Sequence, residues 1–191
     1  MALSKIDAAN FLTGTIPQGN VANASLGAVT ALPAGVGGKV LQIQTTFKSS
    51  VSTVSTNGDG FVDVTGMSVS ITPSSSSSKI LCQASLFYMI NNTTYGNLGG
   101  IRFMRGSTAI GTGGQDYSSG TVVGIDNSTN NTNLFATVPL LFLDSPSTTS
   151  ATTYKLQARN SIGGDINLYV NGRRNGSNYG ASTITVMEIA A

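Results

Sequence analysis

The catalytic side chains available to this chain are few. Its 191 residues include no histidine and a single cysteine, Cys82. A Ser–His or Cys–His pair is therefore excluded, because no imidazole is present to accept the proton of a nucleophile. Cys82 lies in the apolar run 79–88, which predicts a small buried core residue rather than a reactive thiol. A single cysteine also excludes an intrachain disulfide.

Carboxylates offer a second route to catalysis, because glycosidase chemistry needs two of them close together. The acids are seven aspartates and Glu188, and most of the aspartates lie beside Gly, Asn or Ser, where they cap backbone amides in turns. Asp59 and Asp63 could share a face across a turn. A polysaccharide depolymerase therefore stays open as an alternative, with these two residues as its only support.

Two loop patterns bear comparison with ligand-binding motifs. The segment Asn57-Gly-Asp-Gly60 lacks the alternating acids and the downstream glutamate of a calcium loop, and it favours a tight turn. The glycine-rich stretches 35–38 and 111–114 are not followed by Lys-Ser/Thr, so they do not match a phosphate loop. We expect neither a metal nor a cofactor.

The segment best suited to recognition joins the last two expected strands. Residues 169–179 combine Tyr169, Arg173, Arg174 and Tyr179 with several amide side chains. Arginine and tyrosine bind sugars, phosphates and protein surfaces at a small entropic cost. We interpret this loop as a candidate surface-recognition site. The alternative is a solvated hairpin loop whose charges keep the protein soluble.

Charge and hydropathy exclude several classes of function. Charged residues form only 9% of the chain, and 10 basic against 8 acidic residues leave a net charge of +2. So weak a positive field argues against nucleic-acid binding. No apolar run reaches the roughly 18 residues of a membrane span, and the first residues lack the pattern of a signal peptide. We therefore expect synthesis in a cytoplasm and no membrane insertion.

The elements that would position these side chains are β-strands. Alternating and β-branched runs separated by turns predict an all-β domain over residues 39–191, a jelly-roll-like β-sandwich of about nine strands. The apolar run 80–90 predicts a central strand, whereas Pro139 predicts an edge strand or a bulge. The expected strand positions are 40–47, 61–71, 80–90, 101–105, 108–110, 122–125, 134–143, 153–158, 166–170 and 182–189.

Residues 1–38 differ from the rest of the chain in the spacing of their apolar residues. Single apolar residues are scattered among glycines and prolines, which predicts an extended N-terminal arm with a short helix after Ser4. These apolar residues are too sparse to form a core, so we expect them to dock on another surface, more readily that of another chain. The candidates for anchoring are Ile6, Phe11, Leu12, Ile16 and Val21.

Several segments, taken in order, resemble a known family. They are Thr13-Gly-Thr-Ile-Pro-Gln-Gly-Asn-Val-Ala-Asn23, Val29–Gln42, Ile71–Leu81, Met104–Gly111, Leu143–Lys155 and Thr183–Ala190. Together they resemble the tail-fibre-like and appendage proteins of marine bacteriophages, especially cyanophages, over nearly the whole chain. The resemblance implies a virion structural protein with a jelly-roll-like body, commonly trimeric, whose N-terminal region attaches to the particle.

The expected function follows from the resemblance and the arm together. We expect a non-catalytic phage virion protein: a short fibre, knob or decoration component, because almost no shaft precedes the body. Residues 1–38 would bind other virion proteins, and exposed loops would contact a host-surface glycan or protein, or simply decorate the particle. A homotrimer is expected also because a sheet protein with few charges has poorly protected edges. A free carbohydrate-binding module is the alternative.

Overall fold

The computed structural model describes residues 40–55, 60–92, 98–112, 121–124, 132–160, 167–173 and 176–191. All of them belong to the unit Gly38–Ala191. The expected arm, its short helix and its five anchoring candidates lie outside the described residues. The described strands are β1 (Val40–Lys48), β2 (Ser52–Ser55), β3 (Val62–Ile71), β4 (Lys79–Asn92), β5 (Leu98–Arg105), β6 (Thr108–Ile110), β7 (Thr121–Gly124), β8 (Thr132–Asp144), β9 (Thr152–Asn160), β10 (Asn167–Val170) and β11 (Ser182–Ile189).

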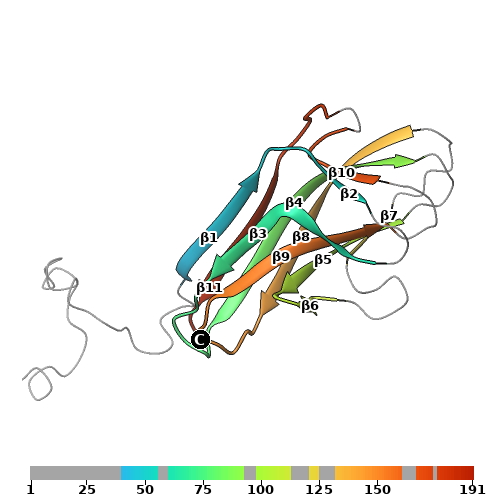
Figure 1. Cartoon of the computed structure of the whole chain (residues 1–191). Helices are drawn as coiled ribbons and strands as arrows, with labels where there is room; N and C mark the ends of the chain where they lie inside the picture. Colours follow the sequence, from blue (N-terminus) through green and yellow to red (C-terminus); the bar gives the residue numbers. More distant parts are fainter. Residues whose placement is uncertain are drawn as a thin grey trace, which may run out of the picture. The chain divides into compact units, whose positions relative to one another are not determined.

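The strands form two antiparallel sheets. In the first, β4 pairs along one edge with β11 and then β10, and along its other edge with β8; β1 extends the sheet beyond β11, and β2 extends it beyond β10. In the second, β9 lies between β3 and β5, and β6 and β7 both pair with β5. Figure 1 shows β1 alongside β11 in one layer and β3 alongside β9 in the other.

The strand order is that of a jelly roll. The eight main strands, all but the short β2, β7 and β10, are lettered B to I in chain order. The first sheet then has the order B-I-D-G (β1, β11, β4, β8), and the second has the order C-H-E-F (β3, β9, β5, β6). The all-β sandwich expected from the sequence is thus confirmed. So are two details: β4 is a central strand, and β8, which holds Pro139, pairs only with β4 among the described strands.

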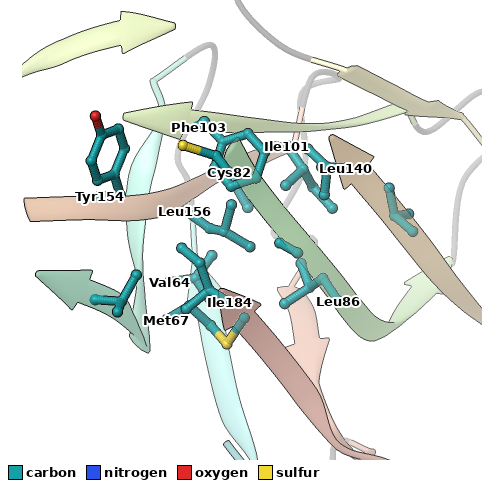
Figure 2. Packing of buried hydrophobic residues seen from close by; sticks show 14 of the residues in the cluster. Val64, Met67, Cys82, Leu86, Ile101, Phe103, Leu140, Tyr154, Leu156 and Ile184 are labelled. Atoms are coloured by element: carbon teal, nitrogen blue, oxygen red, sulfur yellow. The ribbon is translucent and has the colours of Figure 1, made fainter. Parts of the chain in front are cut away.

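The core lies between the two sheets because their strands alternate. In β11 the even-numbered residues from Ser182 to Glu188 are buried, and the odd-numbered ones are partly exposed. Figure 2 shows side chains from both sheets meeting in this core, among them Met67, Leu86, Leu156 and Ile184. Burial of these residues supplies the main driving force for folding.

Candidate recognition site at the β10–β11 loop

Cys82 is a core residue, as predicted. It lies in β4 and is fully buried. Desolvation by burial, with a smaller contribution from the negative charge of Asp144, raises the pKa of the thiol to about 12. At neutral pH the side chain is therefore a thiol and not a nucleophilic thiolate.

Asp63 takes part in a surface network, and Asp59 lies outside the described residues. The carboxylate of Asp63 accepts hydrogen bonds from Lys155 Nζ at 2.6 Å and Gln157 Nε2 at 2.7 Å, and these bonds lower its pKa. A carboxylate held in its charged form by a lysine is a poor proton donor. The described part of the chain brings together no three of His, Cys, Asp and Glu that could hold a metal ion.

Two buried carboxylates are structural. Asp144 accepts hydrogen bonds from Arg105 Nη1 at 2.8 Å and from the Tyr154 hydroxyl at 2.7 Å, which ties the end of β8 to β5 and β9. Glu188, in β11, has no exposed surface. It accepts hydrogen bonds from Gln42 Nε2 and from the amide and hydroxyl of Ser74, each at 2.7 Å.

The pKa of Glu188 is set by burial and by these hydrogen-bond donors. Burial alone would raise the pKa, but the hydrogen bonds from Gln42, Ser74 and Ser78 outweigh burial and lower it from 4.5 to about 2. The charged carboxylate thus fixes the serine-rich loop 74–78 against β1 and β11. Sequence reasoning missed this role, because the donors lie 114 and 146 residues away along the chain.

The loop between β10 and β11 is anchored by a buried asparagine. Asn171 has a left-handed backbone (φ 62°) and no exposed surface. Its Nδ2 donates to the carbonyl of Lys48 at 2.7 Å, its Oδ1 accepts from the Ser182 hydroxyl at 2.6 Å, and its amide donates to the carbonyl of Phe87 at 3.0 Å. Asparagine tolerates this conformation better than most residues. The loop is therefore fixed to β1, β4 and β11 at its start.

The end of the loop returns over the outer face of the first sheet. The amide of Tyr179 donates to the carbonyl of Asn171 at 2.8 Å. Gly180 lies so close to β4 that a Cβ atom there would be 2.5 Å from Phe87 Cγ. Only a residue without a side chain permits this approach.

This return path builds a stack of rings and a guanidinium group. The ring of Phe135, on β8, lies 5.9 Å from that of Phe87 and 5.5 Å from that of Tyr179. The guanidinium carbon of Arg173 lies 5.4 Å from the Phe135 centroid and 4.8 Å from the Tyr179 centroid. These separations suit aromatic and cation–π attraction. Half of the Tyr179 surface stays exposed (51%).

The recognition residues expected from the sequence are placed as follows. Arg173 and Tyr179 come together in this stack, and Phe135, which the sequence did not single out, joins them. Tyr169 lies in β10 with only 5% of its surface exposed, so its side chain offers little area to a partner. Arg174 lies outside the described residues.

A second ring-and-guanidinium cluster lies on the second sheet. The guanidinium carbons of Arg102 and Arg159 lie 4.0 and 5.1 Å from the ring centroid of Phe61. Arg102 also donates two hydrogen bonds to Gln157 Oε1, at 3.0 and 2.7 Å. Desolvation, and secondarily the like charge of Arg159, lower the pKa of Arg102. A Cβ on Gly100 would lie 3.1 Å from the edge of the Phe61 ring, so glycine allows the ring to approach β5.

Comparison with known proteins identifies distant structural similarity only. No family model and no curated protein matches the sequence. Similar solved structures include a viral particle of infectious bursal disease virus (14% identity, TM-score 0.37, covering 78% of this chain and 37% of that one). The VP2 subviral particle of the same virus is 13% identical, with a TM-score of 0.38 over 78% of this chain and 38% of that one.

A phage protein is also among the similar structures. The enzymatically active domain of a tailspike protein of bacteriophage CBA120 is 16% identical, with a TM-score of 0.19 over 77% of this chain and 19% of that one. The chain thus spans less than half the length of each of these three proteins. Among the described residues, no helix is long and apolar enough to span a membrane.

Proposed function

We propose that this chain is a phage virion structural protein, a short fibre, knob or decoration component, whose β-sandwich is held on the particle by residues 1–38. The proposal includes a homotrimeric assembly and no catalytic step. Its support is the resemblance in sequence to marine phage appendage proteins, together with a sandwich in which three of the described turns are braced by buried hydrogen bonds.

The braced turns are the observation that carries the proposal. Three of the segments that carry the resemblance fall on turns between strands: residues 71–81, 104–111 and 143–155. Glu188 holds the first, and the Arg105–Asp144–Tyr154 network joins the other two. These hydrogen bonds give the three described turns a fixed outer shape. A fixed shape suits a component of a particle, whose neighbours must fit it repeatedly.

Deleting residues 1–38 tests the attachment. In cells infected by the virus that encodes the chain, we expect full-length protein to sediment with particles, and the shortened protein to stay in the soluble fraction while its circular dichroism and unfolding transition remain those of a folded β domain. An unfolded shortened protein would show instead that residues 1–38 complete the core. Particles that still incorporate a folded shortened protein would contradict the proposal.

A second candidate function, carbohydrate binding, is favoured by the Arg173–Phe135–Tyr179 stack. A half-exposed tyrosine beside a guanidinium group offers a flat apolar surface and hydrogen-bond donors, the combination that sugars use. A glycan array comparing the wild type with Arg173→Ala, Arg174→Ala and Tyr179→Ala tests it. Binding that weakens in these variants would support the function, whereas a wild type that binds no glycan would exclude it.

A further inference from the structure

The outer face of the first sheet carries an apolar row that crosses four strands. Ile43 of β1 lies opposite Met187 of β11, which lies opposite Leu81 of β4, which lies opposite Leu143 of β8. Directly opposite residues in antiparallel strands point to the same side of a sheet. Their sequence neighbours, such as Val186 and Cys82, point into the core. The row therefore faces outward.

The adjacent rows extend this apolar surface. Leu141 of β8 belongs to the next row, and its side chain is 70% exposed. Phe47 of β1 belongs to the row after that, and its side chain is 65% exposed. Ile43 and Leu143 are themselves 56% and 54% exposed. An antiparallel sheet with one face in water normally alternates apolar and polar residues. These strands instead place large apolar side chains on both faces, and monomers rarely leave so large an apolar patch in water.

The charge of this face restricts what can cover it. The outward residues between the apolar side chains are Thr45, Thr183, Thr185, Gln83, Ser85 and Pro139. Among the described outward residues of β1, β4, β8 and β11, the one charge is Lys79, at the margin of the face and bonded to Ser145 Oγ at 2.8 Å. A charged partner would lose its hydration here without gaining a counter-charge. Arg173 of the β10–β11 loop lies over Phe135 at the far end of β8. Away from that end, a neutral covering surface with apolar and hydroxyl groups fits this face.

The extent of the face indicates how much of it a partner must cover. With about 4.8 Å between strands and 3.3 Å per residue, four strands over seven residues give a footprint on the order of 20 by 20 Å. A standard stable interface buries about 800 Å² of accessible surface per partner, about twice this planar footprint, so a partner must cover the whole of it and follow its side chains closely. A neutral sheet face with apolar and hydroxyl rows meets both conditions, and this chain carries one.

We propose that the outer face of β1, β11, β4 and β8 is the surface through which one copy of this chain binds a second copy. Ile43, Leu141 and Leu143 are the apolar anchors, and the threonine and glutamine rows supply neutral polar contacts. The inference goes beyond the proposed assembly role: a face that packs on the same face of a second copy makes a two-fold contact, which is separate from the contacts of the proposed homotrimer. It is tested in solution with purified full-length chain, so its failure and the failure of attachment to a particle are separate results.

Sedimentation velocity over a range of concentrations is the first test. We expect the wild type to sediment as an oligomer, and Leu141→Asp and Ile43→Asp each to raise the dissociation constant at least tenfold, because a buried apolar contact is replaced by an unpaired charge. Val62→Asp is the control: Val62 is an aliphatic residue of the other sheet, 37% exposed at the margin of the core and opposite Ala158, so circular dichroism first verifies that this variant is folded. This change should leave the association intact.

A second measurement keeps the inference open to refutation if the aspartate variants misfold. In Leu141→Cys, reaction with a maleimide should slow as protein concentration rises, whereas in Val62→Cys the rate should not change. The natural Cys82 is fully buried and should not react with the maleimide in either variant. A wild type that is monomeric at every concentration would overturn the proposal. So would an oligomer that neither face variant weakens and in which the Leu141→Cys thiol reacts at a concentration-independent rate.

Discussion

At the scale of single residues, buried polar side chains hold the connecting segments of this sandwich. Glu188 accepts hydrogen bonds from β1 and from the 74–78 loop, and Asn171, which follows β10, donates a hydrogen bond to the last residue of β1. A buried hydrogen-bond acceptor that loses its partners, or a donor left without one, costs about 1–3 kcal/mol, and more when the group is charged. These two residues therefore fix the positions of the segments to which they are bonded.

Replacing Glu188 should destabilise the fold. In Glu188→Ala the side chain of Gln42 and the amide of Ser74 lose their acceptor, and we expect the free energy of unfolding to fall by about 2–4 kcal/mol. Chemical denaturation measures this change. Exposed Ser76→Ala, in the same loop, is the control and should cost less than about 0.5 kcal/mol. Equal losses in the two variants would contradict the assigned role of the carboxylate.

The same carboxylate should make stability depend on pH. Its pKa is about 2 in the folded chain against 4.5 for an unperturbed glutamate. Since the unfolded chain takes up the proton more readily, the stabilisation is complete above pH 4.5 and is lost as the pH falls toward 2. The stability difference between wild type and Glu188→Gln, measured by denaturation across this range, should therefore shrink with acidification. A difference that stays constant from pH 6 to the acid limit would be inconsistent with this account.

At the scale of elements, the loop between β10 and β11 is positioned by close contact with β4. Gly180 touches the ring of Phe87, and the loop then carries Tyr179 onto Phe135. The stack is therefore an outcome of backbone placement as well as of attraction between rings. Changing the backbone contact should displace the stack.

Gly180→Ala should disturb this loop. The new methyl group would meet Phe87, and overpacking of this kind costs about 1–3 kcal/mol. We expect a lower unfolding temperature and altered NMR shifts for the Tyr179 ring protons, because that ring would move relative to Phe135. Gly60→Ala is the control, since a Cβ there meets nothing within 4 Å. Unchanged Tyr179 shifts in Gly180→Ala would contradict the contact.

Much of the element plan could be predicted because alternation is a local signal. The expected strands 61–71, 80–90 and 182–189 differ from β3, β4 and β11 by at most two residues at either end. β2 was missed because Ser52–Ser55 contains a single buried apolar residue, Val54, and so shows no pattern. With β2 added to the ten expected strand positions, the described residues contain eleven strands, against the sandwich of about nine that was expected.

The site was harder to predict because its contacts are distant in sequence. Arg173 and Tyr179 were identified from their types within one loop, but Phe135 reaches them from a strand more than thirty residues earlier. Tyr169 was expected on the surface, yet it is buried on β10. No local sequence pattern indicates which outward residues a later loop will cover. No local pattern indicates the hydrogen-bond partners of Glu188 either.

At the scale of the whole molecule, an almost uncharged outer face is the feature that bears on assembly. Charged residues are rare in the chain as a whole (9%) and nearly absent from the outward side of β1, β11, β4 and β8. An association built on such a surface draws its free energy from apolar burial rather than from ion pairs. Its response to solution conditions should follow from that.

Self-association of the chain should be insensitive to sodium chloride and should weaken on cooling. Salt screens charge–charge attraction, and the interface offers almost none. Apolar burial is a weaker driving force at low temperature. Sedimentation at low and high salt, and at two temperatures, measures both effects. A dissociation constant that rises steeply with salt would indicate an interface formed by charged residues elsewhere on the molecule.

The central claim is that this chain works as a structural part of a virus particle. The most direct measurement is its location: gradient-purified particles of the virus that encodes it, analysed by quantitative mass spectrometry and by gold labelling with an antibody to the β-sandwich. The account predicts the chain in the particle fraction, in multiple copies per particle and at a fixed place on the particle. A chain found only in the soluble fraction, with unlabelled particles, would contradict it.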